Sequence, residues 1–283
     1  MNHKELEKMI DEVLNTEAAQ TTLDIYKYIG LHRTIAQREA GKFIKYFEDF
    51  FDELNIAIQY LNFVPKKTWE MHKSIQYLLY PEAMKTLHRA FEDTIDGYYD
   101  EAMMLLRSVY ETSLRILFLS CYPKEWEAIF FDRKNKMNFK VTGFAKDHLK
   151  LDWDFIYRIM SKIHHSKVTK NLSSLIRRSK PNTNDPIIIE YRVDKELLWM
   201  AINFITFNLC CLFHVMMSIF KDDFDKHDNL KVRMDRLKKI DQILLGLIEA
   251  NPKEKFASLA KDLKKVGKII KYADSGKDWK KIV

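Results

Sequence analysis

Glycine, proline and cysteine are scarce in this chain, whose 283 residues contain 7 Gly, 6 Pro and 3 Cys. Sheets joined by tight turns need more glycine and proline, so the shortage favours long helices with few corners. Hydrophobic residues make up 47% of the chain, which is enough to build a sizeable core. The composition therefore predicts an all-α multi-helix bundle with at most one short extended segment.

The three cysteines also exclude several kinds of site. Cys121 and the adjacent Cys210 and Cys211 lie in apolar helical sequence and have neither a disulfide framework nor the spacing of zinc ligands. This usage is typical of buried thiols in a reducing compartment, so we expect a cytoplasmic protein.

Known catalytic motifs are missing as well. The sequence has no Gly-rich phosphate loop with Lys-Ser/Thr, no His-Glu-x-x-His, no paired Glu-x-x-His and no Gly-x-Ser-x-Gly elbow. His164 and His165 are adjacent, so on a helix their side chains would point about 100° apart and would not easily share a metal. We expect neither a metal nor another cofactor.

Charge is distributed unevenly along a chain of net charge +7. Residues 133–180 carry 13 Lys and Arg against 3 Asp and Glu, and residues 221–283 carry 17 against 11. Residues 1–132 are acidic, with 15 basic groups against 22 acidic ones. Such blocks can bind a partner of opposite charge, or they can pair with each other or remain solvated faces.

Hydrophobic periodicity and proline positions divide the chain into three regions: an N-terminal helical region (1–80), a helical core (81–220) and a basic C-terminal helical hairpin (221–283). The expected helices are Thr34–Phe63, one starting at Pro81 and ending before Asp96-Gly97, Tyr98–Ser120, one from Pro123 to near Phe131, and one within Thr169–Ser179. The β-branched run Ile187–Val193 is the expected extended segment.

One uncharged stretch, Leu197–Phe220, is long enough to cross a bilayer. Small polar side chains recur along one side of it at Asn203, Thr206, Cys210, His214 and Ser218, and acidic groups flank both ends. These features favour a central core helix over a membrane span.

The C-terminal region contains a second amphipathic pattern. Seven lysines between Lys253 and Lys271 lie largely opposite an apolar stripe. This helix could dock on an acidic membrane or on nucleic acid, or it could cap the bundle with its lysines in water. The second reading is favoured, because surface helices ordinarily have this pattern.

The most basic window holds the candidate catalytic residues Arg158, His164 and His165. Arg158 and His165 are seven positions apart, so a continuous helix would place both on one side, with Ser161 and Lys162 between them. Arginine can grip a phosphate bidentately and histidine can move a proton, which suits attack of an RNA 2′-hydroxyl on the adjacent phosphate. The alternative is that these residues, with Lys167, only complement the dipole at a helix C-terminus.

A second charged constellation lies on the expected Tyr98–Ser120 helix. Arg107, Glu111 and Arg115 follow one another at intervals of four on an otherwise apolar helix. They could form a solvent-facing ladder that stabilises the helix slightly. They could instead form a buried polar network that positions the basic window.

Together the two patches resemble the HEPN-like superfamily, all-helical bacterial domains of toxin and phage-defence systems. The first match is Gly97-Tyr98-Tyr99 followed by Glu101-Ala102, Leu106-Arg107 and Glu111, and the second is Tyr157-Arg158 with Ser161 and His165-Ser166. The resemblance covers roughly residues 80–220 and has low specificity. It implies metal-independent ribonuclease activity at a homodimer groove, with Arg158 on phosphate and His165 as the acid–base group; His164 also satisfies the looser spacing.

These observations lead to one expected function and one alternative. The first is an RNA-cleaving toxin or defence protein that acts as a homodimer, with RNA and an antitoxin or other protein as partners. Its candidate substrate-binding residues are Ser161, Lys162, Lys167, Arg107 and Glu111. The alternative is a noncatalytic helical module that binds nucleic acid or a partner protein. Membrane association is not expected.

Overall fold

The computed structural model describes residues 22–63, 69–131, 143–146, 176–178, 187–189 and 195–249. The principal helices in order are α2 (Thr22–Tyr60), α3 (Met71–Asp96), α4 (Tyr99–Cys121), α5 (Trp126–Phe130), α9 (Lys195–Phe224) and α10 (Asp228–Glu249). Two 3-10 turns, η1 (Leu61–Phe63) and η3 (Pro123–Glu125), follow α2 and α4. The predicted all-α multi-helix bundle is thereby confirmed.

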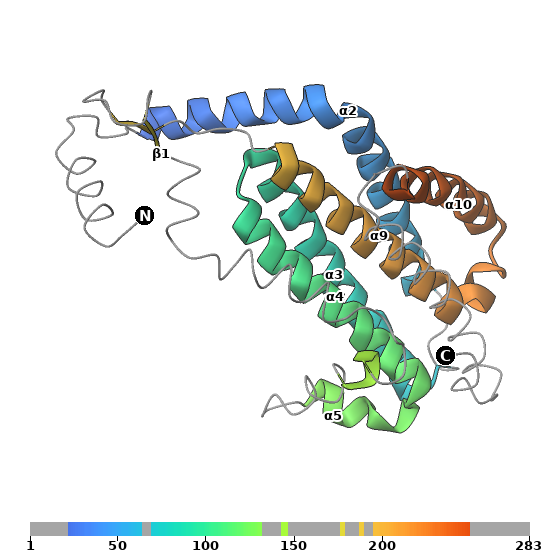
Figure 1. The fold of residues 1–283 in the computed structure, drawn as a ribbon. Helices are drawn as coiled ribbons and strands as arrows, with labels where there is room; N and C mark the ends of the chain where they lie inside the picture. The colour runs from blue at the N-terminus through green and yellow to red at the C-terminus, as the bar shows by residue number, and fades with distance from the viewer. Residues whose placement is uncertain are drawn as a thin grey trace.

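Helices α3, α4 and α9 form the centre of the bundle and lie side by side (Figure 1). Helix α4 packs against both α3 and α9, and α3 also contacts α9. The buried residues of α4 recur three or four positions apart, which gives it one apolar face for its neighbours. They include Leu106, Tyr110, Leu114 and Leu117. The sequence predicted this helix within one residue at each end.

Helix α2 bends at Ala40, whose backbone leaves helical geometry (φ −130°, ψ 18°). Before the bend, α2 crosses the end of the bundle near the α3–α4 connection, and after it α2 descends beside α10 (Figure 1). The second segment buries phenylalanines that follow one another at helical spacing. Phe47 stacks on Phe91 of α3 with ring centroids 4.1 Å apart, and Phe50 meets Phe213 of α9 edge-on.

The expected helix start at Pro81 is wrong, because Pro81 lies inside α3. Proline in a helix interior costs about 3 kcal/mol relative to alanine. Here the ring is exposed, whereas Tyr80, Ala83 and Leu87 beside it are buried in the core. Burial of this face offsets the local cost, so α3 continues through residues where sequence alone suggests a boundary.

Two three-residue strands lie outside the helical part. Strand β1 (Ile176–Arg178) pairs antiparallel with β2 (Ile187–Ile189), in the register Ile176 to Ile189. The predicted extended segment is confirmed at Ile187–Ile189. The helix expected within Thr169–Ser179 is wrong at Ile176–Arg178, where pairing with a β-branched strand overrides local helical preference.

The uncharged stretch forms most of α9, which contacts α2, α3, α4 and α10. The segment Leu197–Phe224 is apolar and long enough to cross a membrane, but 83% of its most apolar window is buried inside the protein. This fits the core helix of a soluble protein, as predicted. Helix α3 runs through residue 80 and α9 through residue 220, so both region boundaries drawn from the sequence fall within helices.

Candidate functional site

Only part of the predicted site lies among the described residues. Arg107 and Glu111 are on α4. The other candidates, in the basic window, lie outside the described residues: Arg158, Ser161, Lys162, His164, His165 and Lys167. The same holds for the lysine-rich segment 253–271. The geometry of α4 is therefore the part of the predicted site that the structure describes.

Arg107 donates from Nε to Glu111 Oε1 at 3.1 Å, one helical turn away. Their side chains are 32% and 25% exposed, which is intermediate between a solvent-facing ladder and a buried network. Leu106 and Tyr110, beside them on the helix, are fully packed, so the pair lies at the edge of the core. Because the pair is partly buried, solvent screens its charges less than it would screen those of a fully exposed pair. The ion pair holds the Arg107 guanidinium at a fixed place on the surface of the bundle.

The turn that begins α4 is formed by Gly97. Its φ of 91° is left-handed, and the N–H of Gly97 bonds to Thr94 O while the N–H of Tyr98 bonds to Asp93 O at 2.7 Å. This is a Schellman closure, which uses carbonyls that the end of α3 would otherwise leave unpaired. It sets where α4 starts and thus where Arg107 and Glu111 lie.

His32 of α2 covers this turn. Its ring is 1% exposed and lies edge-on to Tyr99 with centroids 5.8 Å apart. A Cβ atom at position 97 would be 2.7 Å from His32 Nε2, so the imidazole occupies space that only glycine leaves open. The first segment of α2 is thus fitted to the α3–α4 connection.

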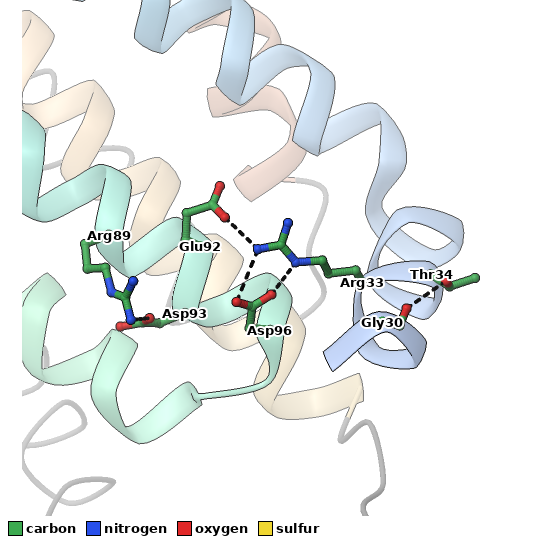
Figure 2. Close-up of polar contacts among 7 residues, drawn as sticks. All are labelled: Gly30, Arg33, Thr34, Arg89, Glu92, Asp93 and Asp96. Atoms are coloured by element: carbon green, nitrogen blue, oxygen red, sulfur yellow. Dashed lines mark hydrogen bonds and ion pairs between the residues drawn. The ribbon is translucent and has the colours of Figure 1, made fainter. Parts of the chain in front are cut away.

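The neighbouring Arg33 adds charge to the same contact. Figure 2 shows its guanidinium reaching from α2 to the last turn of α3, where it bonds to both oxygens of Asp96 and, at 2.8 Å, to Glu92 Oε2. The hydrogen bond to Asp96, with the charges of both carboxylates, raises the pKa of Arg33. The guanidinium is half exposed, so water screens part of this attraction.

Asp93, one turn earlier on α3, is a buried carboxylate that bonds to Arg89 at 2.9 Å (Figure 2). Burial raises the pKa of Asp93, and the charges of Glu101 and Asp96 raise it further, whereas Arg89 opposes the shift. Arg89 is 69% exposed and compensates the buried charge only in part. Ionisation of the Asp93 carboxyl is consequently less favourable than that of an exposed aspartate.

A separate charged contact joins α2 to α10. Glu53, 8% exposed, accepts a hydrogen bond on each carboxylate oxygen: Arg233 Nη1 lies 2.6 Å from Oε2 and Arg236 Nη1 lies 2.7 Å from Oε1. The contact borders an open pocket of about 400 Å³, whose described lining also includes Tyr60, Asn229 and Val232. Sequence reasoning missed this cluster, because its members are about 180 positions apart and share no local pattern.

The polar stripe of α9 meets Asp241 of α10. His214 Nε2 lies 3.0 Å from Asp241 Oδ2, and the predicted buried thiol Cys210 is fully buried one turn before His214. Burial, with the charge of Asp241, raises the pKa of the Cys210 thiol, and burial raises the pKa of Cys211 to about 12. A nucleophilic cysteine needs a depressed pKa and access, so this Cys-His-Asp set is a packing contact.

No group of three or more His, Cys, Asp or Glu residues in the described ranges is placed to hold a metal ion. No protein-family model, curated protein or solved structure gives a significant match to the sequence.

Proposed function

We propose that the chain is a cytoplasmic, metal-independent endoribonuclease of a toxin or phage-defence type. The observation that carries the proposal is the arrangement of Arg158 and His165, seven positions apart in a window with 13 basic against 3 acidic residues. On a continuous helix this spacing would bring a phosphate-binding guanidinium and a titratable imidazole to one side. The all-α bundle and the half-buried Arg107–Glu111 pair on α4 are consistent with it.

The proposed reaction needs no metal. His165 takes the proton of an RNA 2′-hydroxyl, and the 2′-oxygen forms a bond to the adjacent phosphorus. The bond to the 5′-oxygen breaks as that oxygen takes a proton from water, and His165 then returns its own proton to the solvent. Arg158 and Lys162 stabilise the negative charge on the phosphoryl oxygens in the transition state. The products are a 2′,3′-cyclic phosphate and a 5′-hydroxyl end.

Two other residues have proposed roles in binding. Ser161 and Lys167 contact the RNA backbone beside the reacting phosphate. The Arg107–Glu111 pair supports the basic window from α4, and in a homodimer two copies of the window would line one groove. An antitoxin or other partner protein would then act by covering that groove.

The test incubates the purified full chain with end-labelled RNA in the presence of EDTA. Cleavage with 2′,3′-cyclic phosphate ends is expected, and an RNA whose 2′-hydroxyls are methylated should remain intact. Arg158→Ala and His165→Ala should each lower the rate by about 10²–10⁴, the usual contribution of a positioned acid–base or charge-stabilising group. Comparing the rate of His164→Ala with that of His165→Ala shows which of the two imidazoles transfers the proton.

Matched controls come from the same region of the sequence. Arg133→Ala removes one charge from the basic window and His148→Ala removes one imidazole; both should cleave at the parent rate. The proposal would be refuted if cleavage requires a metal, or if both Arg158→Ala and His165→Ala still cleave. It would also be refuted if neither the parent nor any variant cleaves RNA.

The second candidate function is noncatalytic binding of nucleic acid by the basic regions. It is favoured by the net positive charge of residues 133–180 and of residues 221–283. Binding of RNA or DNA without turnover is then expected, with an affinity that falls steeply as salt rises, because phosphate contacts release counterions. Binding of RNA or DNA that is independent of ionic strength would contradict this function.

A further inference from the structure

The pocket between α2 and α10 has a lining of mixed chemistry that does not include Arg107 or Glu111. Its described walls are Glu53 and Tyr60 from the second segment of α2, and Asn229, Val232, Arg233 and Arg236 from the first turns of α10. Its volume of about 400 Å³ falls within the range of small-molecule sites, roughly 300–1,000 Å³. The pocket is therefore large enough for a compact organic ligand.

The charge of the described lining is positive. Glu53 is its only carboxylate, and it faces two guanidinium groups. One arginine would be enough to neutralise the buried carboxylate and to join α10 to α2, so the second leaves one positive charge in excess. The two groups are 34% and 56% exposed, so they remain open to a ligand.

The hydrogen bonds to Glu53 use one nitrogen of each guanidinium, Nη1 of Arg233 and Nη1 of Arg236. A guanidinium has five N–H groups in a planar fork, so most of the donors of both residues remain for another acceptor. The guanidinium groups of Arg233 and Arg236 are already oriented, because both bond to the buried carboxylate of Glu53. This orientation lowers the conformational entropy that is lost when an anion binds.

Of the other described lining residues, Asn229 is polar, Val232 is apolar and Tyr60 is aromatic. Val232, next to Arg233 in the sequence, is 73% exposed. Tyr60 is half-buried, and its ring meets that of Phe63 edge-on with the ring centroids 6.2 Å apart. Phe63 is itself 79% exposed. Apolar and aromatic groups next to cations suit a ligand that has an anionic head and an apolar body.

We propose that this pocket binds a small organic anion, with its carboxylate or phosphate held by Arg233 and Arg236 and its apolar body against Tyr60 and Val232. None of its described lining residues belongs to the proposed nuclease centre. Ligand binding there would join α2 and α10 more firmly, because the anion bonds to α10 while its body contacts α2.

The experiment titrates the full chain with phenyl phosphate, benzoate and inorganic phosphate by isothermal titration calorimetry. Saturable binding of phenyl phosphate or benzoate is expected, at least about tenfold tighter than that of inorganic phosphate, because only the first two have a ring for the apolar walls. Whichever of phenyl phosphate and benzoate binds with the higher affinity shows whether the site prefers a phosphate or a carboxylate.

Two variants and one control locate the site. Arg236→Gln should weaken binding by about tenfold or more while Arg233 keeps its bond to Glu53, and Lys239→Gln, one turn along the exposed side of α10, should change it less than twofold. Val232→Glu places a carboxylate on a wall that is 73% exposed in the folded chain, and it should abolish binding. No saturable binding, or equal weakening by Arg236→Gln and Lys239→Gln, would overturn the proposal.

Discussion

The imidazole of His32 lies where a side chain at position 97 would begin, since a Cβ built there is 2.7 Å from His32 Nε2. The contact joins the first segment of α2 to the turn that starts α4. Because Gly97 also has a positive φ, two separate constraints require glycine at this position.

Gly97→Ala is therefore expected to lower the free energy of unfolding by about 2 kcal/mol or more, from the left-handed backbone and the displaced His32 ring. Gly246→Ala is the matched control, because Gly246 is in α10 with nothing within 4 Å of the added methyl. It should raise stability by about 0.5–1 kcal/mol. Urea unfolding followed by circular dichroism measures both, and equal effects would contradict this account of the turn.

The contact between Glu53 and the two arginines should contribute to stability independently of any ligand. Glu53→Ala removes two charge-assisted hydrogen bonds, and we expect a loss of about 1–3 kcal/mol, limited by the exposure of both guanidiniums. Glu48→Ala removes an exposed glutamate from the same helix and should stay within about 0.5 kcal/mol of the parent. A similar loss in both variants would show that the pairing contributes nothing.

The three thiols should differ in reactivity. Cys210 is fully buried, Cys211 is 5% exposed with a pKa raised to about 12, and Cys121 is half-buried. A disulfide reagent at pH 8 is expected to modify one thiol per native chain and three after unfolding in urea. In Cys121→Ser the native reaction should disappear, and rapid modification of that variant would place another thiol at the surface.

Asp93 predicts a pH dependence of stability. Its folded pKa is raised above the ordinary value of 3.8, so the folded chain binds the proton more tightly than the unfolded chain does. The cost of ionising Asp93 is thus absent below pH 3.8 and grows as pH rises through the folded pKa. Asp93→Asn should be more stable than the parent at pH 7, with a gain that vanishes in acid.

Arg89→Gln provides the complementary measurement. Arg89 opposes the raised pKa of Asp93, so its removal should destabilise the chain at pH 7 more than at pH 3.5. Thermal unfolding at both pH values distinguishes the two variants. A gain for Asp93→Asn that persists unchanged at pH 3.5 would show that its origin is not the ionised carboxylate.

Local sequence patterns predicted the elements whose signals are local. The start of α4 follows from Asp96-Gly97, and the core role of α9 follows from its uncharged length and small polar stripe. Pro81 does not begin a helix, because core packing on both sides of its exposed ring outweighs the local penalty of proline. Strand β1 was missed because its stability comes from pairing with β2.

The same division applies to the candidate site. The interval of four residues predicted that Arg107 and Glu111 would meet, and they do. Their half-buried position depends on the packing of other helices against α4, so no pattern within α4 could choose between ladder and network. The contact between Glu53 and the two arginines joins positions in α2 and α10, and these positions come together only in the folded chain.

The late position of α9 in the chain has a consequence for synthesis. Helices α2, α3 and α4 leave the ribosome before the helix that contacts all three of them. Until residue 224 has been made and released, their apolar faces have no common partner and stay open to solvent or to chaperones. A translational pause before Lys195 should therefore lengthen the time that the nascent chain remains bound to a chaperone, whereas a pause after Glu249 should not.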